Sequence, residues 1–288
     1  MEYKRKTPTS YLLLPTYFMP YLGIFKIRLI AGMQYRAAAW AGVATQFFWG
    51  GIQLLIFYAF YESAGLNAGA DSPMSFSQLA DFIWMRQAFL ALVMLWSMDS
   101  ELLETIASGN VAYELTKPLS LYTFWFARIL AYRISRTVLR CFPIFIVAFL
   151  LPGDWGFHLP GSLQALALFI PSLIFATFLV TALSMLTCLL TFVSLSPHGA
   201  RLILGVAGEF LMGAIIPIPF MPPTLQLFTA LLPFRYTADF PFRVYSGSIS
   251  GNEALLGLGV QVFWLLALAG LGLWGFRATM KRLVIQGG

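Results

Sequence analysis

The sequence predicts an all-α, polytopic membrane protein that forms a single transmembrane domain over residues 1–288. Of its 288 residues, 59% are hydrophobic and 10% are charged, and the mean hydropathy is +0.78. A soluble globular domain carries about 25% charged residues, so this is the composition of a multi-pass membrane protein. Uncharged stretches long enough to cross a bilayer recur along the chain, and we expect six transmembrane helices.

The charge and cysteine content narrow the function classes further. The net charge of +6 comes from basic residues clustered where a cytoplasmic face needs them, so it does not indicate a nucleic-acid partner. Cys141 and Cys188 lie inside hydrophobic segments, which argues against a disulfide framework. Residues 4–6 are basic like the start of a signal peptide, but Pro15 and Pro20 break the apolar run that follows. We therefore expect no cleavable signal.

Residues 1–36 are expected to form a cytoplasmic tail and then a helix that begins at Pro20 and lies in the inner membrane interface. Lys26 and Arg28 on this helix can extend to the lipid headgroups. The alternative is that the same helix is a cytoplasmic extension of the first spanning helix. That first span is expected over residues 37–61, which are uncharged.

The second span is expected over residues 81–98, after an outer loop at 62–77 that contains no Lys or Arg. Arg86 interrupts this span and can extend outward if it lies near the outer end. The polar segment 99–120 then lies on the inner side. This order satisfies the positive-inside rule, given the basic N-terminus and Lys117.

Segment 99–120 is the longest clearly polar stretch after the N-terminal tail. Residues 101–108 are predicted to form a short helix capped by Asp99 or Ser100, with acidic residues in the first turn where the helix dipole favours them. Gly109 and the following Asn tolerate the left-handed conformation that ends a helix. A compact helix and turn on the inner face is interpreted as a contact surface for a soluble partner.

The third helix is expected over residues 122–151 and carries Arg128, Arg133, Arg136 and Arg140. At about 100° per residue, the last three arginines fall within an arc of about 60° on one face. Arg140 would lie deeper in the membrane than the others, where an unpaired charge is costly.

The fourth helix is expected over residues 162–193 and the fifth begins at Arg201, but closely spaced prolines stop the fifth before a normal span is complete. Residues 215–250 are therefore predicted to form short re-entrant helices and an outer region, because broken backbone at membrane depth persists only inside protein or along a wet cavity. The sixth span is expected over residues 254–276, with basic residues at its inner end. Both termini would be cytoplasmic.

The chain lacks the motifs of an enzyme or an ATP-binding protein. No GxxxxGK[ST] sequence is present, so the chain has no P-loop for ATP phosphates. His158 and His198 are predicted on opposite sides of the membrane, so they cannot share a metal or catalytic site. The SGSISG run at 246–251 has no histidine at the same depth to activate a serine. We expect no catalytic, cofactor-binding or metal-binding residues.

Glu209 is the clearest acidic residue predicted within a span, and Arg140 is predicted at a similar depth. One hypothesis is an ion pair between them that links the third and fifth helices. The alternative is that each side chain lies near an interface and is solvated.

Three stretches carry a resemblance to a known family. The run IASGNVAYELTKPLSLYTFWFAR at 106–128 resembles the cytoplasmic segment after the second helix of type-2 ABC exporter permeases. The run GAIIPIPFMPPTLQLFTALLPFRY at 213–236 is similar to their broken fifth-helix region, and KRLVIQGG at 281–288 is similar to their terminus. The resemblance covers the chain end to end, and it is closest to six-helix permeases encoded beside an ATPase and a second permease.

The resemblance implies a permease subunit in the cytoplasmic membrane of a prokaryote. It would form half of a dimeric export pathway, with ATP and Mg²⁺ bound on a separate soluble subunit and no cofactor in this chain. A coupling helix in segment 99–120 would dock on that subunit. The residues placed at this contact are Glu101, Leu102, Glu104, Thr105, Ile106 and Tyr113, with Lys26 and Arg28 as secondary contacts. The residues assigned to an outer gate are Pro217, Pro219, Phe220, Pro222, Pro223 and Phe234.

Other functions stay open at this point. An ion-coupled secondary transporter or channel would need intramembrane carboxylates, and the sequence offers few beyond Glu209 and Asp81. A non-transporting sensor or immunity subunit could use the same ATPase contact. The sequence does not identify the substrate, nor whether the second permease is identical or merely related.

Overall fold

The computed structural model describes residues 13–65, 72–194 and 196–282. The first part of the predicted tail, part of the predicted 62–77 loop and most of the KRLVIQGG motif lie outside these residues. In the described part of the chain the regular elements are all helical. This agrees with the predicted all-α class.

Four long helices form the frame of the molecule: α2 (Arg36–Ser63), α7 (Leu121–Phe149), α8 (Leu163–Ser194) and α12 (Gly251–Arg282). The shorter elements before α8 are α1 (Leu13–Met33), α3 (Phe76–Ala88), α4 (Leu90–Val93), α5 (Ser100–Ala107), α6 (Val111–Leu115) and η2 (Gly153–Trp155). Those after α8 are α9 (Pro197–Leu211), η3 (Ile218–Phe220), α10 (Pro223–Ala230), η4 (Pro233–Thr237) and α11 (Asp239–Tyr245).

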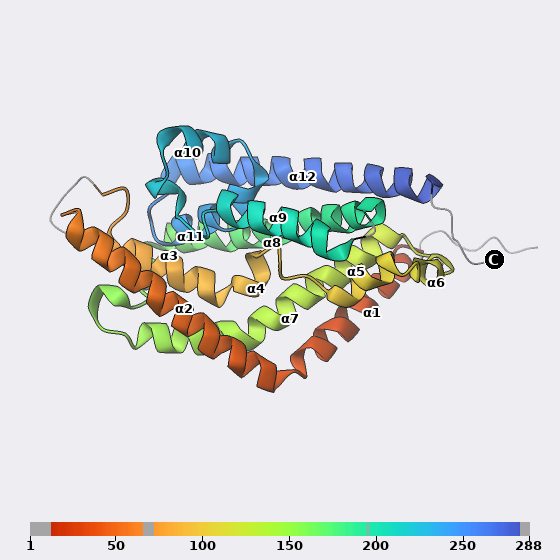
Figure 1. Ribbon diagram of the computed structural model, residues 1–288, viewed down its shortest axis with the longest axis horizontal. Coiled ribbons are helices and arrows are strands. Elements are labelled where there is room, and N and C mark those ends of the chain that lie inside the picture. Colours follow the sequence, from red (N-terminus) through yellow and green to blue (C-terminus); the bar gives the residue numbers. More distant parts are fainter. Residues whose placement is uncertain (1–12, 66–71, 195, 283–288) are drawn as a thin grey trace, which may run out of the picture.

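The bundle is elongated, and its short elements gather at two opposite ends (Figure 1). The α5 end carries α5, α6, the C-terminal end of α12 and much of α1. The α11 end carries α10, α11, the C-terminal end of α2 and the connection between α7 and α8. The long helices run between these ends, so a segment such as α5 is far from the proline-rich region.

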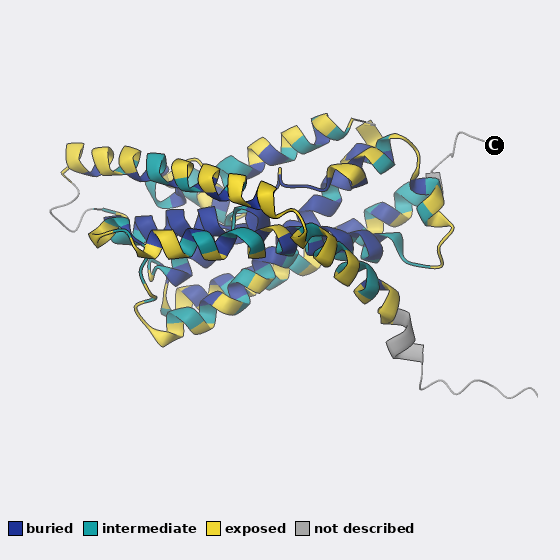
Figure 2. Ribbon diagram, turned by 90° about the horizontal axis from the view of Figure 1, so that it is seen from below, coloured by how far each residue is buried: buried dark blue, intermediate teal, exposed yellow. Residues whose placement is uncertain are grey.

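Three described helices are long and apolar enough to cross a membrane, and they cover Arg36–Ala64, Leu163–Ser194 and Gly251–Lys281. They correspond to the predicted first, fourth and sixth spans. Helix α7 also matches the prediction closely in its ends, but its four arginines lower its hydropathy. The fold is consistent with a membrane protein, and α2 has exposed positions along much of its length (Figure 2).

The predicted second span, residues 81–98, does not form one unbroken helix. Helix α3 begins earlier, at a capping box formed by Ser75 and Gln78, and the helical run ends at Val93 in the short helix α4. After α4, Met94 has an extended backbone and residues 95–96 form a turn before the chain reaches α5. The break is stabilised by Arg133 of α7, whose guanidinium donates to the carbonyl oxygens of Ala91, Leu92 and Met94.

Arg133 therefore has a different environment from the two arginines predicted to share its face. It is completely buried and also donates to Ser184 Oγ in α8 at 2.7 Å. Arg136 is exposed and Arg140 is half-buried. The predicted common face is too simple, because α7 is covered on one side by α4 and α8 and on another by α1 and α2.

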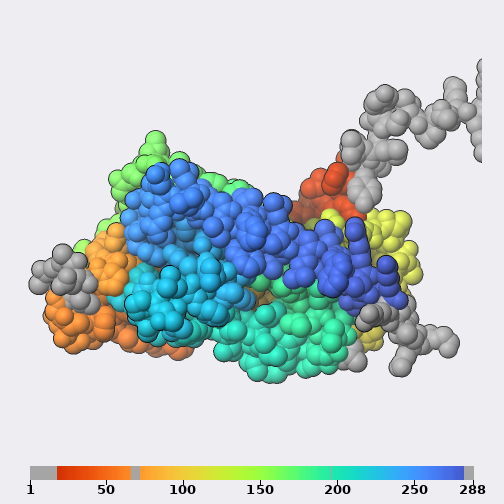
Figure 3. Space-filling model, turned by 90° about the horizontal axis from the view of Figure 1, so that it is seen from above, coloured from red at the N-terminus to blue at the C-terminus, as the bar shows by residue number. Residues whose placement is uncertain are grey.

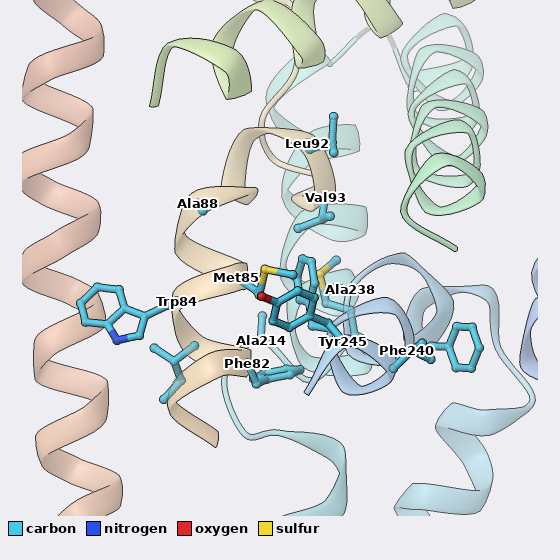
Figure 4. Close-up of a cluster of buried hydrophobic side chains, with 14 of the residues drawn as sticks. Phe82, Trp84, Met85, Ala88, Leu92, Val93, Ala214, Ala238, Phe240 and Tyr245 are labelled. Carbon is cyan, nitrogen blue, oxygen red and sulfur yellow. The ribbon is translucent and has the colours of Figure 1, made fainter. Parts of the chain in front are cut away.

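The proline-rich region forms short helices, as predicted for residues 215–250. Gln226 donates to the carbonyl oxygens of Pro219 and Met221 and so compensates for backbone groups that no helix pairs. Helix α11 lies beside α3 and α8. Helices α3 and α11 share a core that includes Phe82, Met85, Phe240 and Tyr245 (Figure 4). On the opposite face from α2, helix α12 forms a long ridge with α9 and α10 beside it (Figure 3).

Candidate functional site

Helix α5 has the local sequence signals that predicted it. Asp99 is the N-cap and its carboxylate accepts from Leu102 N–H. The helix ends at Ala107, and Gly109 follows with φ of +76°, a left-handed conformation that glycine adopts without a steric penalty. The chain then forms the short helix α6.

One face of α5 is buried. Leu102, Leu103 and Ile106 are almost fully inaccessible and pack in a second hydrophobic cluster with Trp125 of α7 and Phe276 of α12. The prediction that Leu102 and Ile106 contact a partner subunit is therefore wrong for this structure. Their spacing of four residues places them on the apolar side of an amphipathic helix, and that side faces the bundle.

A buried arginine fixes the position of this helix. Arg128 of α7 is nearly inaccessible, and its Nε lies 2.7 Å from Asp99 Oδ2. Its Nη2 lies 3.0 Å from Glu101 Oε2, and its Nη1 lies 3.9 Å from Glu114 Oε1. Glu114 also accepts a hydrogen bond from the indole of Trp125. One guanidinium thus ties both ends of the α5–α6 segment to α7.

Glu101 also connects α5 to α1. Arg28 donates to the Glu101 carboxylate, with Nη1 2.8 Å from Oε2. This hydrogen bond, and the charges of Arg28 and Arg128, lower the pKa of Glu101, while its partial burial opposes them. The same hydrogen bond raises the pKa of Arg28. Both residues, predicted to contact a partner, are engaged within the chain, whereas Lys26 is exposed.

The remaining predicted contact residues form an outward surface on the same segment. Glu104 is exposed, Thr105 is half-buried and the Tyr113 side chain is 76% exposed. Ser108, Asn110 and Lys117 are also exposed. We call Glu104, Thr105, Ser108, Asn110, Tyr113 and Lys117 the α5–α6 surface. It is polar, carries one large exposed aromatic ring and lies on a rigid base.

Four residues have structural roles that were not predicted from the sequence. They are Asp99, for which only capping was predicted, and Arg128, Glu114 and Arg133. For Asp99, Arg128 and Glu114 a usable signal was present: four carboxylates in the polar segment precede an arginine that lies near the start of an apolar helix. A buried charge needs such partners. No comparable signal existed for Arg133, because its acceptors are main-chain carbonyls and one serine hydroxyl, not carboxylates.

Arg140 and Glu209 do not form the predicted pair. Arg140 lines a cavity between α1, α2 and α7. Glu209 of α9 lines a separate hollow of about 350 Å³ with Trp96, His198 and Arg201. Arg86, the buried arginine of the predicted second span, lies in α3 and donates to Gln53. Arg140 and Glu209 lie on different sides of the bundle. Helix α4 lies beside α7, and the segment after α4 lies beside α9.

The residues predicted for an outer gate lie together at the α11 end. Pro217 precedes η3, Pro219 is within it, and Pro222 and Pro223 begin α10. The Phe220 ring packs against aromatic rings at the end of α2, with Tyr61 at 6.1 Å between centroids. Phe234 lies in η4 and approaches Gly208 of α9. His158 lies in the connection between α7 and α8, and its Nδ1 lies 3.1 Å from Asp81 Oδ1.

Comparison with known proteins identifies the family. A family described as ABC-2 family transporter protein matches residues 47–287. The chain belongs to the ABC-2 transporter family. Neither a curated protein nor a solved structure matches it.

The family match includes α5, α6, the proline-rich region, the second and third candidate spans and the part of the first candidate span from residue 47 onward, so the permease assignment applies to these elements. An ABC-2 type permease is the membrane component of a transporter and is not the catalytic subunit. Membership also implies association with an ATP-binding subunit and with the membrane. In the permease, the α5–α6 surface and the proline-rich region lie at opposite ends of the long helices.

Proposed function

We propose that this permease is half of a dimeric ABC exporter and that the α5–α6 surface is its docking site for the soluble ATPase subunit. The chain would cross the cytoplasmic membrane of a prokaryote six times with both termini inside. ATP and Mg²⁺ would bind to the partner subunit, and a second permease, identical or related, would complete the pathway.

The observation that supports this proposal most strongly is the contrast between the inner and outer sides of the α5–α6 segment. Its inner side is fixed by buried leucines and by Arg128, whereas Glu104 and Tyr113 point outward with large exposed areas. A docking helix must transmit a displacement, and a rigid attachment to α7 allows it to do so. Exposed aromatic residues are also enriched at protein interfaces.

In this mechanism, ATP binding closes two partner subunits and moves the two α5–α6 segments together. Because Arg128 joins α5 to α7 and Arg133 joins α7 to α4 and α8, these helices would shift as a unit. The shift would reach the region from Pro217 to Phe234, where backbone outside long helices can rearrange at lower cost. Leu102 and Ile106 act in this proposal as packing residues and not as partner contacts.

The first experiment is a pull-down of the tagged permease from native membranes in mild detergent, with mass spectrometry of the co-purified proteins. We expect a soluble P-loop subunit with the wild type and its loss with Glu104→Lys/Tyr113→Ala. The control is Glu253→Lys/Leu159→Ala, which makes the same charge reversal and truncates a large exposed apolar side chain at two other positions. Equal capture by both double variants, or a chain that comes down alone, would contradict the proposal.

The same preparation separates transport from sensing. An exporter predicts that a candidate substrate stimulates the ATPase activity of the purified complex. A sensor or immunity subunit predicts the same complex without this stimulation. If no ATPase subunit is found, ion-coupled transport through Glu209 is tested with Glu209→Gln.

A further inference from the structure

A cavity of about 370 Å³ opens between α1, α2 and α7, next to α5. Its polar lining includes Arg28, Asp99, Glu101, Arg136 and Arg140. Its other walls are mostly small residues of α1 and α2, so it is a defined hollow with a concentrated charge. The docking proposal for the α5–α6 surface does not involve this cavity.

The charges in the cavity do not balance. Asp99 is paired with Arg128, and Glu101 is paired with both Arg28 and Arg128. Arg136 and Arg140 have no ion pair with an acidic residue in the part of the chain that the structure describes. They are also four residues apart on one helix face, where like charges destabilise each other. An anion between them would remove this repulsion.

Both arginines are held in place towards the cavity. The Arg136 guanidinium stacks over the Tyr132 ring at 4.2 Å from its centroid. The Arg140 Nε is buried and has no hydrogen-bond partner among the described residues. A Cβ at Gly42 of α2 would lie 2.6 Å from Arg140 Cζ, so a glycine leaves the room that this guanidinium occupies. Two positioned guanidinium groups suit the oxygens of a phosphate.

The location indicates where such a phosphate comes from. The cavity lies at the first turn of α2, the helix that begins the first candidate span. Exposed apolar side chains surround this junction: Ile30 and Met33 on α1, Tyr35 before α2 and Trp40 within it. Tyr and Trp concentrate at the level of the headgroups, and the aliphatic side chains suit acyl chains. A soluble phosphate would gain nothing from this apolar rim.

We propose that this cavity binds the phosphate group of an anionic phospholipid through Arg136 and Arg140, with Arg28 at its edge. The ligand chemistry is a phosphodiester, and its source is a lipid headgroup. Because Arg28 lines the cavity while paired with Glu101, the bound phosphate lies beside the contact that joins α1 to α5. The lipid would thus be a structural ligand at the base of the α5–α6 segment.

The test is native mass spectrometry of the delipidated full-length permease after addition of phosphatidylglycerol or phosphatidylcholine. We expect preferential retention of phosphatidylglycerol by the wild type and a reduction of about tenfold in Arg136→Gln/Arg140→Gln, as expected for lost charge-assisted hydrogen bonds. The control is Arg277→Gln/Lys281→Gln, which removes two exposed charges from α12. Equal losses in the two double variants would overturn the site.

A charge-neutral pair of variants covers the case in which the arginine variants fail to fold. Ala38 lines the cavity, and its neighbour Ala37 is exposed but does not. Ala38→Phe should abolish the preference for phosphatidylglycerol, and Ala37→Phe should preserve it. A third measurement adds sn-glycerol 3-phosphate as a competitor to the permease loaded with phosphatidylglycerol. If this soluble phosphate displaces phosphatidylglycerol at equal concentration, the lipid source is wrong, and if the two lipids are retained equally, the selectivity for an anionic lipid is wrong.

Discussion

Arg128 Nε lies 2.7 Å from Asp99 Oδ2, and both side chains are almost fully buried. This pair joins the N-terminus of α5 to α7. Asp99 also caps α5 through Leu102 N–H, so one carboxylate both begins the helix and fixes it to the bundle. The ion pair and the cap therefore depend on each other.

Asp99→Asn is expected to destabilise the permease strongly, because it leaves Arg128 buried with less compensating charge. Removing one partner of a buried pair costs about 3–5 kcal/mol. Asp99→Asn/Arg128→Met should cost less than the two single changes added together. Thermal unfolding in detergent measures all three, and strict additivity would show that the two side chains do not interact.

Arg133→Met is expected to lower the unfolding temperature, because three carbonyl groups at the end of α4 lose their donor. A buried polar group without a partner costs about 1–3 kcal/mol. Arg277→Met on the exposed face of α12 is the matched control and should change stability by less than about 0.5 kcal/mol. If both variants unfold at the same temperature, Arg133 does not stabilise the break after α3.

Two substitutions in the α5–α6 segment should distinguish residues that pack within the chain from residues that dock on the ATPase subunit. Leu102→Ala removes a fully buried side chain and is expected to cost about 2–5 kcal/mol in the free energy of unfolding. Tyr113→Ala should leave stability nearly unchanged and reduce capture of the ATPase subunit. The two measurements are thermal unfolding and the pull-down. A destabilised Tyr113→Ala variant would mean that this ring packs within the chain.

The contact between α1 and α5 should weaken in acid. Arg28 holds the pKa of Glu101 below its ordinary value of 4.5, so the folded state binds fewer protons than the unfolded state. The stabilisation is therefore fully present above pH 4.5 and is lost as the pH falls through the lower, folded-state pKa. Most of the neutral range should show no change.

Spin labels at Lys26→Cys and Ser108→Cys measure this contact through their distance distribution. The native Cys141 and Cys188 are buried, which limits their labelling. We expect a narrow distribution at pH 7 that broadens below pH 4.5. Glu101→Gln should broaden it at every pH, and a pH response that survives this change would assign the effect to another group.

Local sequence patterns were sufficient for much of this fold. The uncharged runs predicted α2, α8 and α12, and the caps and Gly109 predicted the two ends of α5, because hydropathy and capping depend on neighbours in the chain. The break after α3 could not be predicted in this way. Its apolar composition suits a continuous helix, and the donor that stabilises the break, Arg133, comes from α7.

The candidate site shows the same division. The polar segment was found from its composition, and a periodicity of 3.6 residues could have separated buried Leu102 and Ile106 from exposed Glu104. The Arg140–Glu209 hypothesis used depth along two helices, and depth does not specify which way each helix faces. The direction in which a side chain points depends on the rotation of its helix about its axis. Packing sets this rotation, here packing against α4 and the segment after it.

The arginines of α7 have a consequence for how the chain enters the membrane. In translocon experiments, an arginine at the centre of a helix costs about 2.5–3.5 kcal/mol, and α7 carries four. The acidic partners of Arg128 and the carbonyl groups that accept from Arg133 precede α7 in the chain. Ser184, the other acceptor of Arg133, follows α7. Ribosomal synthesis therefore supplies most of these partners before α7 emerges, and α8 completes the set. In the proposed six-span topology, the insertion of α7 would therefore depend on segments made before it and on α8 made after it.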